Sequence, residues 1–226
     1  MWATSRNTII RLIRIGITNC YLVDKKDVKI LIDTGQKSKS EKLKSSLYRL
    51  LGDRNLDYVI LTHAHYDHAE NALMLKKLYS PKILVHKNEA DFLENGFMKL
   101  PKGTNVTANF ISASGNRFAS WIGKYNAVTP DIKVTENYKL ENTEGIEIVH
   151  TPGHTSGSIS IIVDNEIALV GDTLFGIFPK RVLPPFADDK IELYKSWNKL
   201  LETSCKIFLP AHGKTIKREI LEKKIK

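Results

Sequence analysis

The sequence has 226 residues, of which 42% are hydrophobic and 26% charged, and its formal net charge is +9. This balance is typical of a soluble globular protein with a proper core, and the length allows one large domain or two small ones. No apolar run approaches the roughly 18 residues of a membrane-spanning helix, and Arg11 and Arg14 break the N-terminal apolar segment that a secretory signal would need, so we expect a cytoplasmic protein without a membrane partner.

The first part of the chain alternates between strand and helix patterns. Apolar or alternating segments predict strands at 8–15, 20–23, 28–35, 57–61 and 82–86, and helices at 38–51 and 70–79. Ser38 or Ser40 can cap the first helix, which Gly52 ends, and the second helix ends before Pro81.

Residues from about 96 to 132 break this pattern. The segment is rich in Gly, Ser, Asn and Thr, yet its aromatic side chains argue against disorder. Long irregular segments in compact domains are usually functional. We therefore expect a lid over an active site, in which Trp121 and Tyr125 are candidates for covering a substrate.

The second part returns to regular elements. Strands are predicted at 146–151, 158–163, 166–173 and 206–210, and helices at 189–203 and 214–226. A tight turn at Asp164–Asn165 joins two of these strands. Because strands and helices interleave, we expect an α/β fold with mixed sheets in one domain over 1–226. Cys20 and Cys205 lie in apolar, strand-like contexts, where buried and inert thiols are expected.

The segment ILTHAHYDHAEN at 60–71 concentrates potential metal ligands just after a predicted buried strand. Its candidates are His63, His65, Asp67 and His68. In extended geometry His63 and His65 point the same way, because side chains two apart share a face. One divalent ion cannot easily take four ligands from so short a loop, whereas two adjacent ions can.

Two ions need further ligands, and three later residues have the same setting at the end of an apolar run. They are His154 in HTPGHTSGS, Asp172 in LVGDTLF and His212 in FLPAHG. A set of N and O donors without cysteine suits zinc and also allows iron or manganese, and such a set with an open position is typical of a catalytic site. The remaining histidines, His86 and His150, are expected to support the structure or the ligands. The similar segments LIDTG and LVGDT give a weak hint of an internal duplication.

The H-x-H-x-D-H segment, together with TPGHTSGS, GDTLF and PAHG, resembles the metallo-β-lactamase-fold hydrolase superfamily. The resemblance covers the chain from ILIDTG to LPAHG. It implies an αβ/βα sandwich, in which two mixed sheets lie face to face between outer helices and the metals sit at one edge.

The resemblance also implies how the ligands are shared between two zinc ions. His63, His65 and His154 would hold the first metal, Asp67, His68 and His212 the second, and Asp172 would bridge both. Asp33 matches the acidic residue that orients the ligands. A metal-bridging hydroxide would be the nucleophile, and Asp67 would be the catalytic residue that orients it and passes a proton to the leaving group.

Departures from the superfamily's branches narrow the substrate. Asp172 stands where some zinc β-lactamases have a cysteine, and other true β-lactamases lack that aspartate. Lactonases of this superfamily have a tyrosine where Phe175 stands. GDTLF and Arg181 resemble the glyoxalase II group of thioester hydrolases, although its glycines are replaced here. We expect a glyoxalase II-like or lactonase-like enzyme that hydrolyses a small ester, thioester or lactone.

The substrate is expected to be an anionic small molecule, because the chain is basic and Lys180 and Arg181 are candidates for contacting it. Phe175, Trp121 and Tyr125 complete the candidate substrate residues. Alternatives are β-lactam hydrolysis, iron-dependent redox chemistry and hydrolysis of nucleic-acid phosphodiesters. Nucleic acid is a less expected partner, since the charge comes from scattered lysines and not from clustered arginines. The chain is expected to act as a monomer or homodimer.

Overall fold

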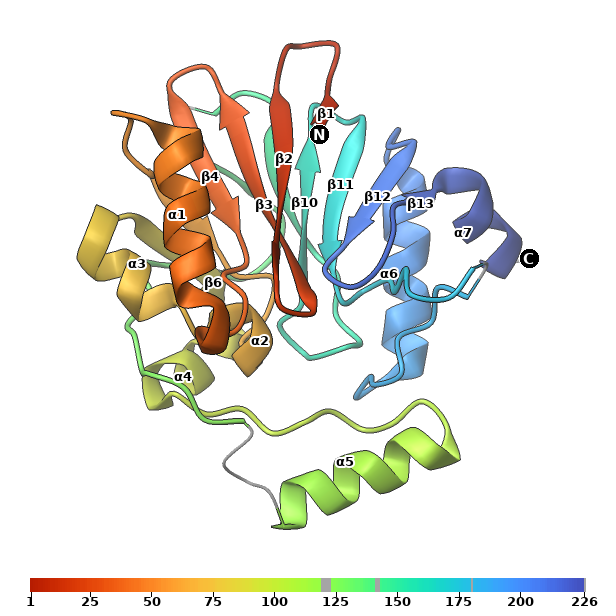
Figure 1. Ribbon diagram of the computed structural model, residues 1–226. Helices are drawn as coiled ribbons and strands as arrows, with labels where there is room; N and C mark the ends of the chain where they lie inside the picture. Colours follow the sequence, from red (N-terminus) through yellow and green to blue (C-terminus); the bar gives the residue numbers. More distant parts are fainter. Residues whose placement is uncertain (119–122, 141–142, 180, 226) are drawn as a thin grey trace.

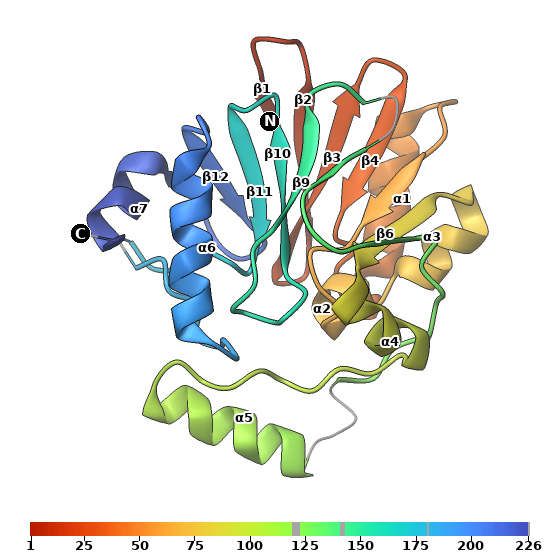
Figure 2. The same cartoon turned by 180° about the vertical axis from the view of Figure 1, so that it is seen from behind.

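The computed structural model describes residues 1–118, 123–140, 143–179 and 181–225. Two β-sheets lie face to face, and helices cover their outer faces (Figure 1). Seen from behind, α6 (Lys190–Glu202) and α7 (Arg218–Ile225) flank the second sheet, while α1 (Ser40–Leu51) and α3 (Ala72–Tyr79) flank the first (Figure 2). Within the described ranges, none of the helices combines the length and apolarity needed to cross a membrane.

The first sheet has seven strands and the second has six. In spatial order the first contains β1 (Trp2–Ala3), β2 (Ile9–Ile15), β3 (Thr18–Lys25), β4 (Val28–Ile32), β5 (Tyr58–Ile60), β6 (Lys82–His86) and β7 (Ile132–Val134). In spatial order the second contains β13 (Ile216–Lys217), β12 (Ile207–Pro210), β11 (Ile167–Gly171), β10 (Ile159–Val163), β9 (Ile146–His150) and β8 (Tyr138–Lys139). The helices are η1 (Lys37–Lys39), α1 (Ser40–Leu51), α2 (Tyr66–Ala69), α3 (Ala72–Tyr79), α4 (Lys87–Asn95), α5 (Val106–Phe118), α6 (Lys190–Glu202) and α7 (Arg218–Ile225).

Apolar side chains form three packed layers. Isoleucine, leucine and valine side chains from both sheets meet in the central layer. The outer layers join α1, α3 and α4 to the first sheet and α6 and α7 to the second. β10 and β11 are buried along their whole length, because both faces of their sheet are covered. This order of helix, sheet, sheet and helix confirms the predicted αβ/βα sandwich.

Parallel strand pairs direct the functional loops to one edge. β4, β5 and β6 run parallel in the first sheet, and β11 and β12 run parallel in the second. β4 leads into the segment LIDTG, and β11 ends in LVG. The two strands have equivalent neighbours in their sheets. Each pairs antiparallel with the preceding strand and parallel with the following one. The carboxyl ends of parallel strands are where α/β folds build sites.

The predicted strands and long helices are confirmed, but the segment from about 96 to 132 is more regular than expected. It contains the helix α5, which the Gly-, Ser-, Asn- and Thr-rich composition did not predict. Below the sandwich in Figures 1 and 2, α5 lies across the edge that holds α2. Gly103 pairs with Phe186, and Thr104 Oγ1 donates to the carbonyl of Pro184 at 2.8 Å. The role of this segment as a lid stays a prediction.

Candidate metal centre

The first four candidate ligands follow β5 directly. His63 and His65 lie in the extended loop after this strand, and Asp67 and His68 lie on the short helix α2. His65 has φ −66° and ψ 150°, so the chain is still extended where the helix begins. The change from extended to helical backbone turns the two pairs of side chains in different directions, as two neighbouring ions would require.

The other three candidates reach the same edge from the second sheet. His154 lies in the loop between β9 and β10, Asp172 follows β11, and His212 follows β12. Gly171, just before Asp172, has φ +50°, and a Cβ there would lie 2.6 Å from Thr62 Oγ1. Only glycine therefore lets the end of β11 come this close to the ligand loop of the first sheet.

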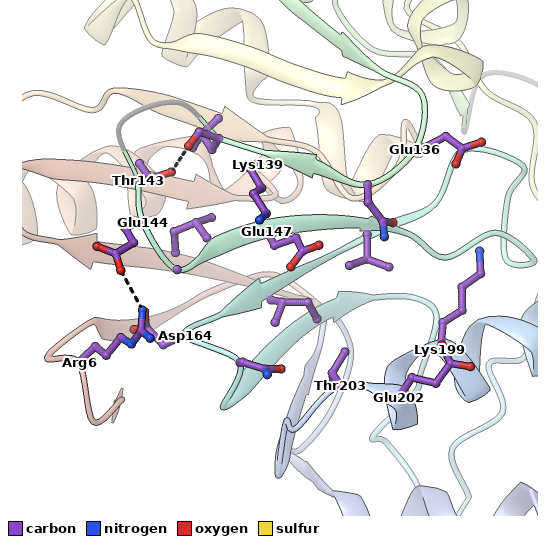
Figure 3. Close-up of a pocket in the computed structure, with 17 residues that line it drawn as sticks. Arg6, Glu136, Lys139, Thr143, Glu144, Glu147, Asp164, Lys199, Glu202 and Thr203 are labelled. Carbon is purple, nitrogen blue, oxygen red and sulfur yellow. Dashed lines mark hydrogen bonds and ion pairs between the residues drawn. The ribbon is translucent and has the colours of Figure 1, made fainter.

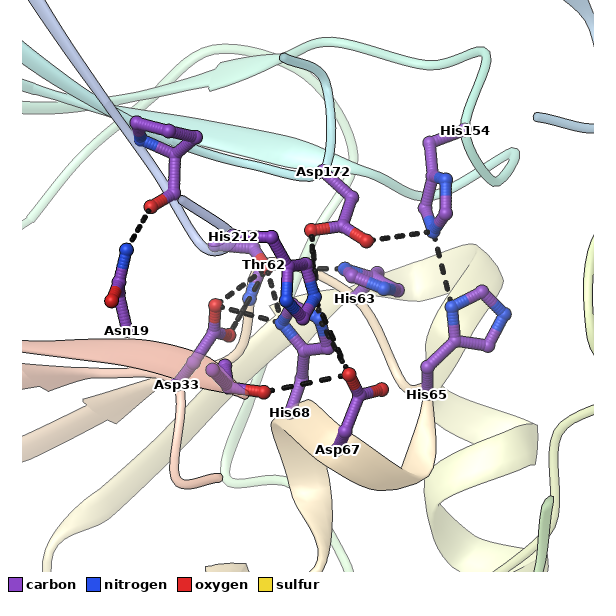
Figure 4. Close-up of polar contacts among 12 residues, drawn as sticks. Asn19, Asp33, Thr62, His63, His65, Asp67, His68, His154, Asp172 and His212 are labelled. Carbon is purple, nitrogen blue, oxygen red and sulfur yellow. Dashed lines mark hydrogen bonds and ion pairs between the residues drawn. The ribbon is translucent and has the colours of Figure 1, made fainter. Parts of the chain in front are cut away.

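All seven predicted ligands come together in one buried cluster (Figure 4). None of them is more than 8% exposed. Their ligand atoms form three groups, each within 4.8 Å: His63, His65 and His154; His63, His68 and Asp172; Asp67, His68 and His212. Residues separated by most of the chain thus present nitrogen and oxygen atoms to one small volume.

Hydrogen bonds fix which nitrogen of each histidine faces the cluster. Asp33 Oδ2 accepts from His68 Nδ1 at 2.9 Å, and its other oxygen accepts from the backbone N–H of Thr62 at 2.8 Å. Nδ1 of His154 donates to the carbonyl of Phe186 at 2.9 Å, and Nδ1 of His212 donates to the carbonyl of Ile17 at 3.0 Å. With Nδ1 as the donor, Nε2 of each of these three rings is the nitrogen left for a metal, which binds it once it carries no proton.

Several of these buried atoms lack a hydrogen-bond partner within the described part of the chain. They are Nε2 of His63, His65 and His68 and Oδ1 of Asp172. In addition, Nδ1 of His65 and Nε2 of His154 lie 3.1 Å apart. Buried polar atoms are nearly always paired, so unpaired nitrogens that converge on carboxylate oxygens fit a bound cation.

Asp172 lies between two of these groups, that of His63, His65 and His154 and that of Asp67, His68 and His212. Its Oδ2 is 3.6 Å from Nε2 of His154, whereas its Oδ1 is 3.4 Å from Nε2 of His212 and 3.7 Å from Nε2 of His68. Asp67 belongs to one side only, with its Oδ2 3.3 Å from Nε2 of His212. One carboxylate oxygen therefore faces each group.

The charges of the cluster favour a cation. Burial alone would lower the pKa of His68, but the carboxylates of Asp33, Asp67 and Asp172 outweigh it and raise the pKa to about 10. Burial lowers the pKa of His65 and of His154 to about 3, so both rings are neutral at ordinary pH. A divalent cation fits both the carboxylates, whose charge it neutralises, and the neutral imidazoles, which it binds.

The two remaining histidines lie outside this cluster. The rings of His86 and His150 stack with centroids 4.1 Å apart. His86 Nε2 donates to the carbonyl of Thr135 at 2.7 Å, and His150 Nε2 donates to that of Ser156 at 2.9 Å. These contacts join β6 of one sheet to β9 of the other.

The candidate substrate residues occupy different surroundings. Phe175 lies beside the cluster, with its ring centroid 4.9 Å from that of His212. Tyr125 packs on the core next to α4 and donates its hydroxyl to the carbonyl of Ala64 at 2.7 Å. Arg181 is exposed in the turn after Phe178. Trp121 and Lys180 lie outside the described residues.

Sequence reasoning named Asp33 but missed other groups that hold the ligands in place. Thr62 Oγ1 donates to Asp33 at 2.9 Å and lies 3.1 Å from Nδ1 of His63. Glu89, which is fully buried on α4, binds the backbone of two ligand loops. The one local signal for this role of Glu89 is that it lies on the same helix face as buried Ala90 and Leu93.

A large cavity lies away from the cluster. Its volume is about 880 Å³, and it opens beside β9 and the Asp164–Asn165 turn, at the far end of β10 from the ligand loops (Figure 3). Charged side chains of both signs line it, and Arg6 pairs with Glu144 across 3.3 Å. The histidine and aspartate cluster therefore lies apart from this cavity.

Known proteins resemble this chain in fold and in sequence. The family model described as the metallo-beta-lactamase superfamily matches residues 13–212. The chain belongs to this superfamily. It is 30% identical over 200 residues to the probable metallo-hydrolase MJ0888 of Methanocaldococcus jannaschii, with 87% of each chain covered.

Two further superfamily relatives agree with this assignment. The hydroxyacylglutathione hydrolase GloC of Haemophilus influenzae is 32% identical over 162 residues, which cover 70% of this chain and 66% of that protein. The crystal structure of ST1585 from Sulfolobus tokodaii, an archaeal metallo-beta-lactamase superfamily protein, has a TM-score of 0.70 at 25% identity and covers 96% of this chain and 84% of that one. The expected enzyme class is confirmed: the chain is a metallo-hydrolase with a metal-binding His and Asp cluster.

Proposed function

We propose that this metallo-hydrolase holds two zinc ions and cleaves a small anionic ester, thioester or lactone. Thioesters are the substrates it would hydrolyse fastest. The observation that carries the proposal is the position of Asp172, which turns one oxygen to Nε2 of His154 and the other to Nε2 of His68 and His212. A carboxylate that serves a single ion does not need ligand nitrogens on both sides.

The donor set supports zinc. With Asp172 shared, four protein donors would hold each ion: the other three would be His63, His65 and His154 on one side and Asp67, His68 and His212 on the other. Imidazole and carboxylate donors without thiolate suit zinc, and iron or manganese are the alternatives that the same donors allow. The hydrogen bonds that fix the rings of His68, His154 and His212 raise their basicity as ligands.

When bound, the ions supply an acidified water at neutral pH and polarise the scissile carbonyl. In the metal-free chain burial would raise the pKa of the Asp67 carboxyl, but His68 and His212 outweigh it and lower that pKa. Bound cations would have the same effect and keep Asp67 ionised. An ionised Asp67 accepts a hydrogen bond from the attacking water and so orients it. Thr18 Oγ1 donates at 3.4 Å to Oδ2 of Asp67, the oxygen that also lies 3.3 Å from Nε2 of His212.

The substrate class rests on similarity and on the surroundings of the cluster. The relative GloC is named a hydroxyacylglutathione hydrolase, and its match covers 70% of this chain. The ring of Phe175 offers an apolar surface beside His212 and has no hydroxyl to donate to a carbonyl. The net charge of +9 favours substrates that carry a carboxylate.

The test is a metal analysis followed by a substrate panel. Zinc-loaded protein should contain two zinc ions per chain and hydrolyse thioesters faster than simple esters, lactones and β-lactams. Activity confined to β-lactams or phosphodiesters would overturn the substrate class. A single iron per chain, with consumption of dioxygen, would overturn both the metal and the reaction.

A further inference from the structure

Glu89 is a buried carboxylate that lies outside the ligand cluster but contacts two of the three loops that supply its histidines. Its side chain, on α4, is fully buried. One oxygen accepts from the backbone N–H of Ala64 at 2.9 Å, and the other accepts from that of Gly157 at 3.0 Å. Ala64 belongs to the loop after β5, and Gly157 belongs to the loop between β9 and β10.

Both contacts lie close in sequence to histidines of the group formed by His63, His65 and His154. Ala64 separates His63 from His65, and Gly157 follows His154 in its loop. The carbonyl of Ala64 is also taken, since it accepts from the hydroxyl of Tyr125 at 2.7 Å. Side chains therefore hold the backbone of Ala64 at both its N–H and its C=O.

Gly157 is shaped for this contact. A Cβ at this position would lie 2.5 Å from Cγ and 2.7 Å from Oε1 of Glu89. Any side chain at 157 would push the carboxylate away from the loop. The close approach of glycine backbone and glutamate makes a rigid bridge between the two sheets.

A buried carboxylate is an expensive way to fill space, since an apolar side chain of similar size would avoid its desolvation. Two backbone N–H groups that point at one carboxylate offset that cost and fix a distance between the loops. A hydrophobic contact would permit sliding, whereas two hydrogen bonds to one rigid group do not.

We propose that Glu89 is a positioning residue that sets the geometry of the cation site formed by His63, His65 and His154. The inference rests on the proposed pair of cations. In the described part of the chain the hydrogen bonds of Glu89 go to the backbone N–H groups of Ala64 and Gly157 and not to a ligand side chain, so it acts through this backbone. The second site, which contains Asp67, His68 and His212, takes its support from Asp33 and Ile17 and does not depend on Glu89.

The test compares zinc binding by the wild-type chain and Glu89→Gln, each stripped with a chelator and titrated against a chromophoric competitor. Glutamine keeps the size of the side chain but turns an NH₂ group toward one of the two N–H donors. We expect one of the two binding steps to weaken about 10-fold or more, while the other keeps its wild-type affinity. Ring ¹⁵N signals show which site has changed: those of His63, His65 and His154 should need more zinc to shift.

Two further variants keep the outcome decisive. Asp164→Asn removes a buried carboxylate at the far end of β10 and should leave both binding steps unchanged; an equal loss there would assign the effect to general destabilisation and overturn the inference. If Glu89→Gln does not fold, Gly157→Ala displaces the same carboxylate and should show the same selective loss. Wild-type affinity at both steps in the folded Glu89 or Gly157 variant would overturn the inference, whereas a wild-type chain that binds no pair of cations would refute the proposed function itself.

Discussion

Asp172→Asn is the sharpest test of the paired cation site. The substitution keeps the shape of the side chain, removes its negative charge and replaces one oxygen by an NH₂ group. Oδ1 lies 3.4 Å from Nε2 of His212, and Oδ2 lies 3.6 Å from Nε2 of His154. Whichever way the amide turns, the NH₂ group faces one of the two cation positions.

The size of the effect follows from this geometry. Changes to groups that merely orient metal ligands cost about 10- to 100-fold in affinity, so the loss of a direct carboxylate ligand should weaken one binding step at least about 100-fold. At saturating zinc this factor corresponds to about 2.7 kcal/mol less stabilisation of the folded state. For a domain of this length the zinc-induced rise in Tm should shrink by roughly 5–11 °C.

Three measurements on the same samples check this expectation. Mass spectrometry of dialysed protein should find one zinc per variant chain where the wild type holds two, and calorimetry should show the smaller rise in Tm. Thioester hydrolysis should fall about 1,000-fold, the range seen when one electrostatic group is removed from an active site. A variant that keeps two zinc ions at wild-type affinity, or full turnover, would refute the bridging position of Asp172.

Other expectations concern the support of the cluster and the fold. Asp33→Asn should weaken zinc binding about 10- to 100-fold, because His68 loses the carboxylate that orients its ring; competition with a chelator measures this, and unchanged affinity would contradict the role of Asp33. Because the pKa of His68 is raised to about 10, the ring is protonated in the metal-free chain at pH 7, and zinc must displace that proton. Calorimetric titrations in buffers of different ionisation enthalpy should detect this release, and it should decline as the pH rises toward 10; zinc binding without proton release at pH 7 would contradict it. Asp164→Asn should cost about 3 kcal/mol of unfolding free energy, since it leaves the buried ammonium of Lys25 without its carboxylate. Burial would raise the pKa of Asp164, but hydrogen bonds led by that from Lys25 lower it, so this stabilisation is present above about pH 4 and is lost as the pH falls through the lower folded-state pKa. Urea unfolding between pH 3 and 7 should show wild type and variant converging at acid pH, and a constant gap would contradict the reasoning.

The ligand set could be predicted because its chemistry is local. His63, His65, Asp67 and His68 are neighbours in sequence after an apolar run, and this run predicts a buried strand with a fixed end. His154 and His212 follow strands in the same way, with a glycine beside each to make the turn. Period and spacing therefore predicted the α/β class and the candidate ligands, whereas the αβ/βα sandwich was implied by the resemblance to the superfamily.

The supporting contacts could not be predicted in the same way. The carbonyls of Ile17 and Phe186, which orient His212 and His154, are backbone atoms that any residue would supply. Glu89 lies on α4, whose nine residues bury few apolar side chains, so that helix has a weak periodic signal. Such contacts depend on how the two sheets stack, and a single stretch of sequence does not encode that.

The helix α5 was missed for a related reason. Its large apolar side chains Val106, Phe110 and Phe118 are exposed, while the residues it buries are the small Ala108 and Ser112. A helix that turns small residues inward lacks the apolar face on which sequence patterns rely. Hydrogen bonds fix it instead, as in that from Ser112 Oγ to the carbonyl of Pro101 at 2.6 Å.

Thr62 marks the seam where the two sheets touch. Its carbonyl accepts from the amide of Ile159 on β10 at 2.9 Å, and Gly171 of β11 presses against its side chain. Cations bound by ligands from both sheets would hold the two sheets together at this seam. Deuterium should therefore reach the Ile159 amide faster in chelator than in zinc, so that one peptide proton reports whether the two halves are fastened together.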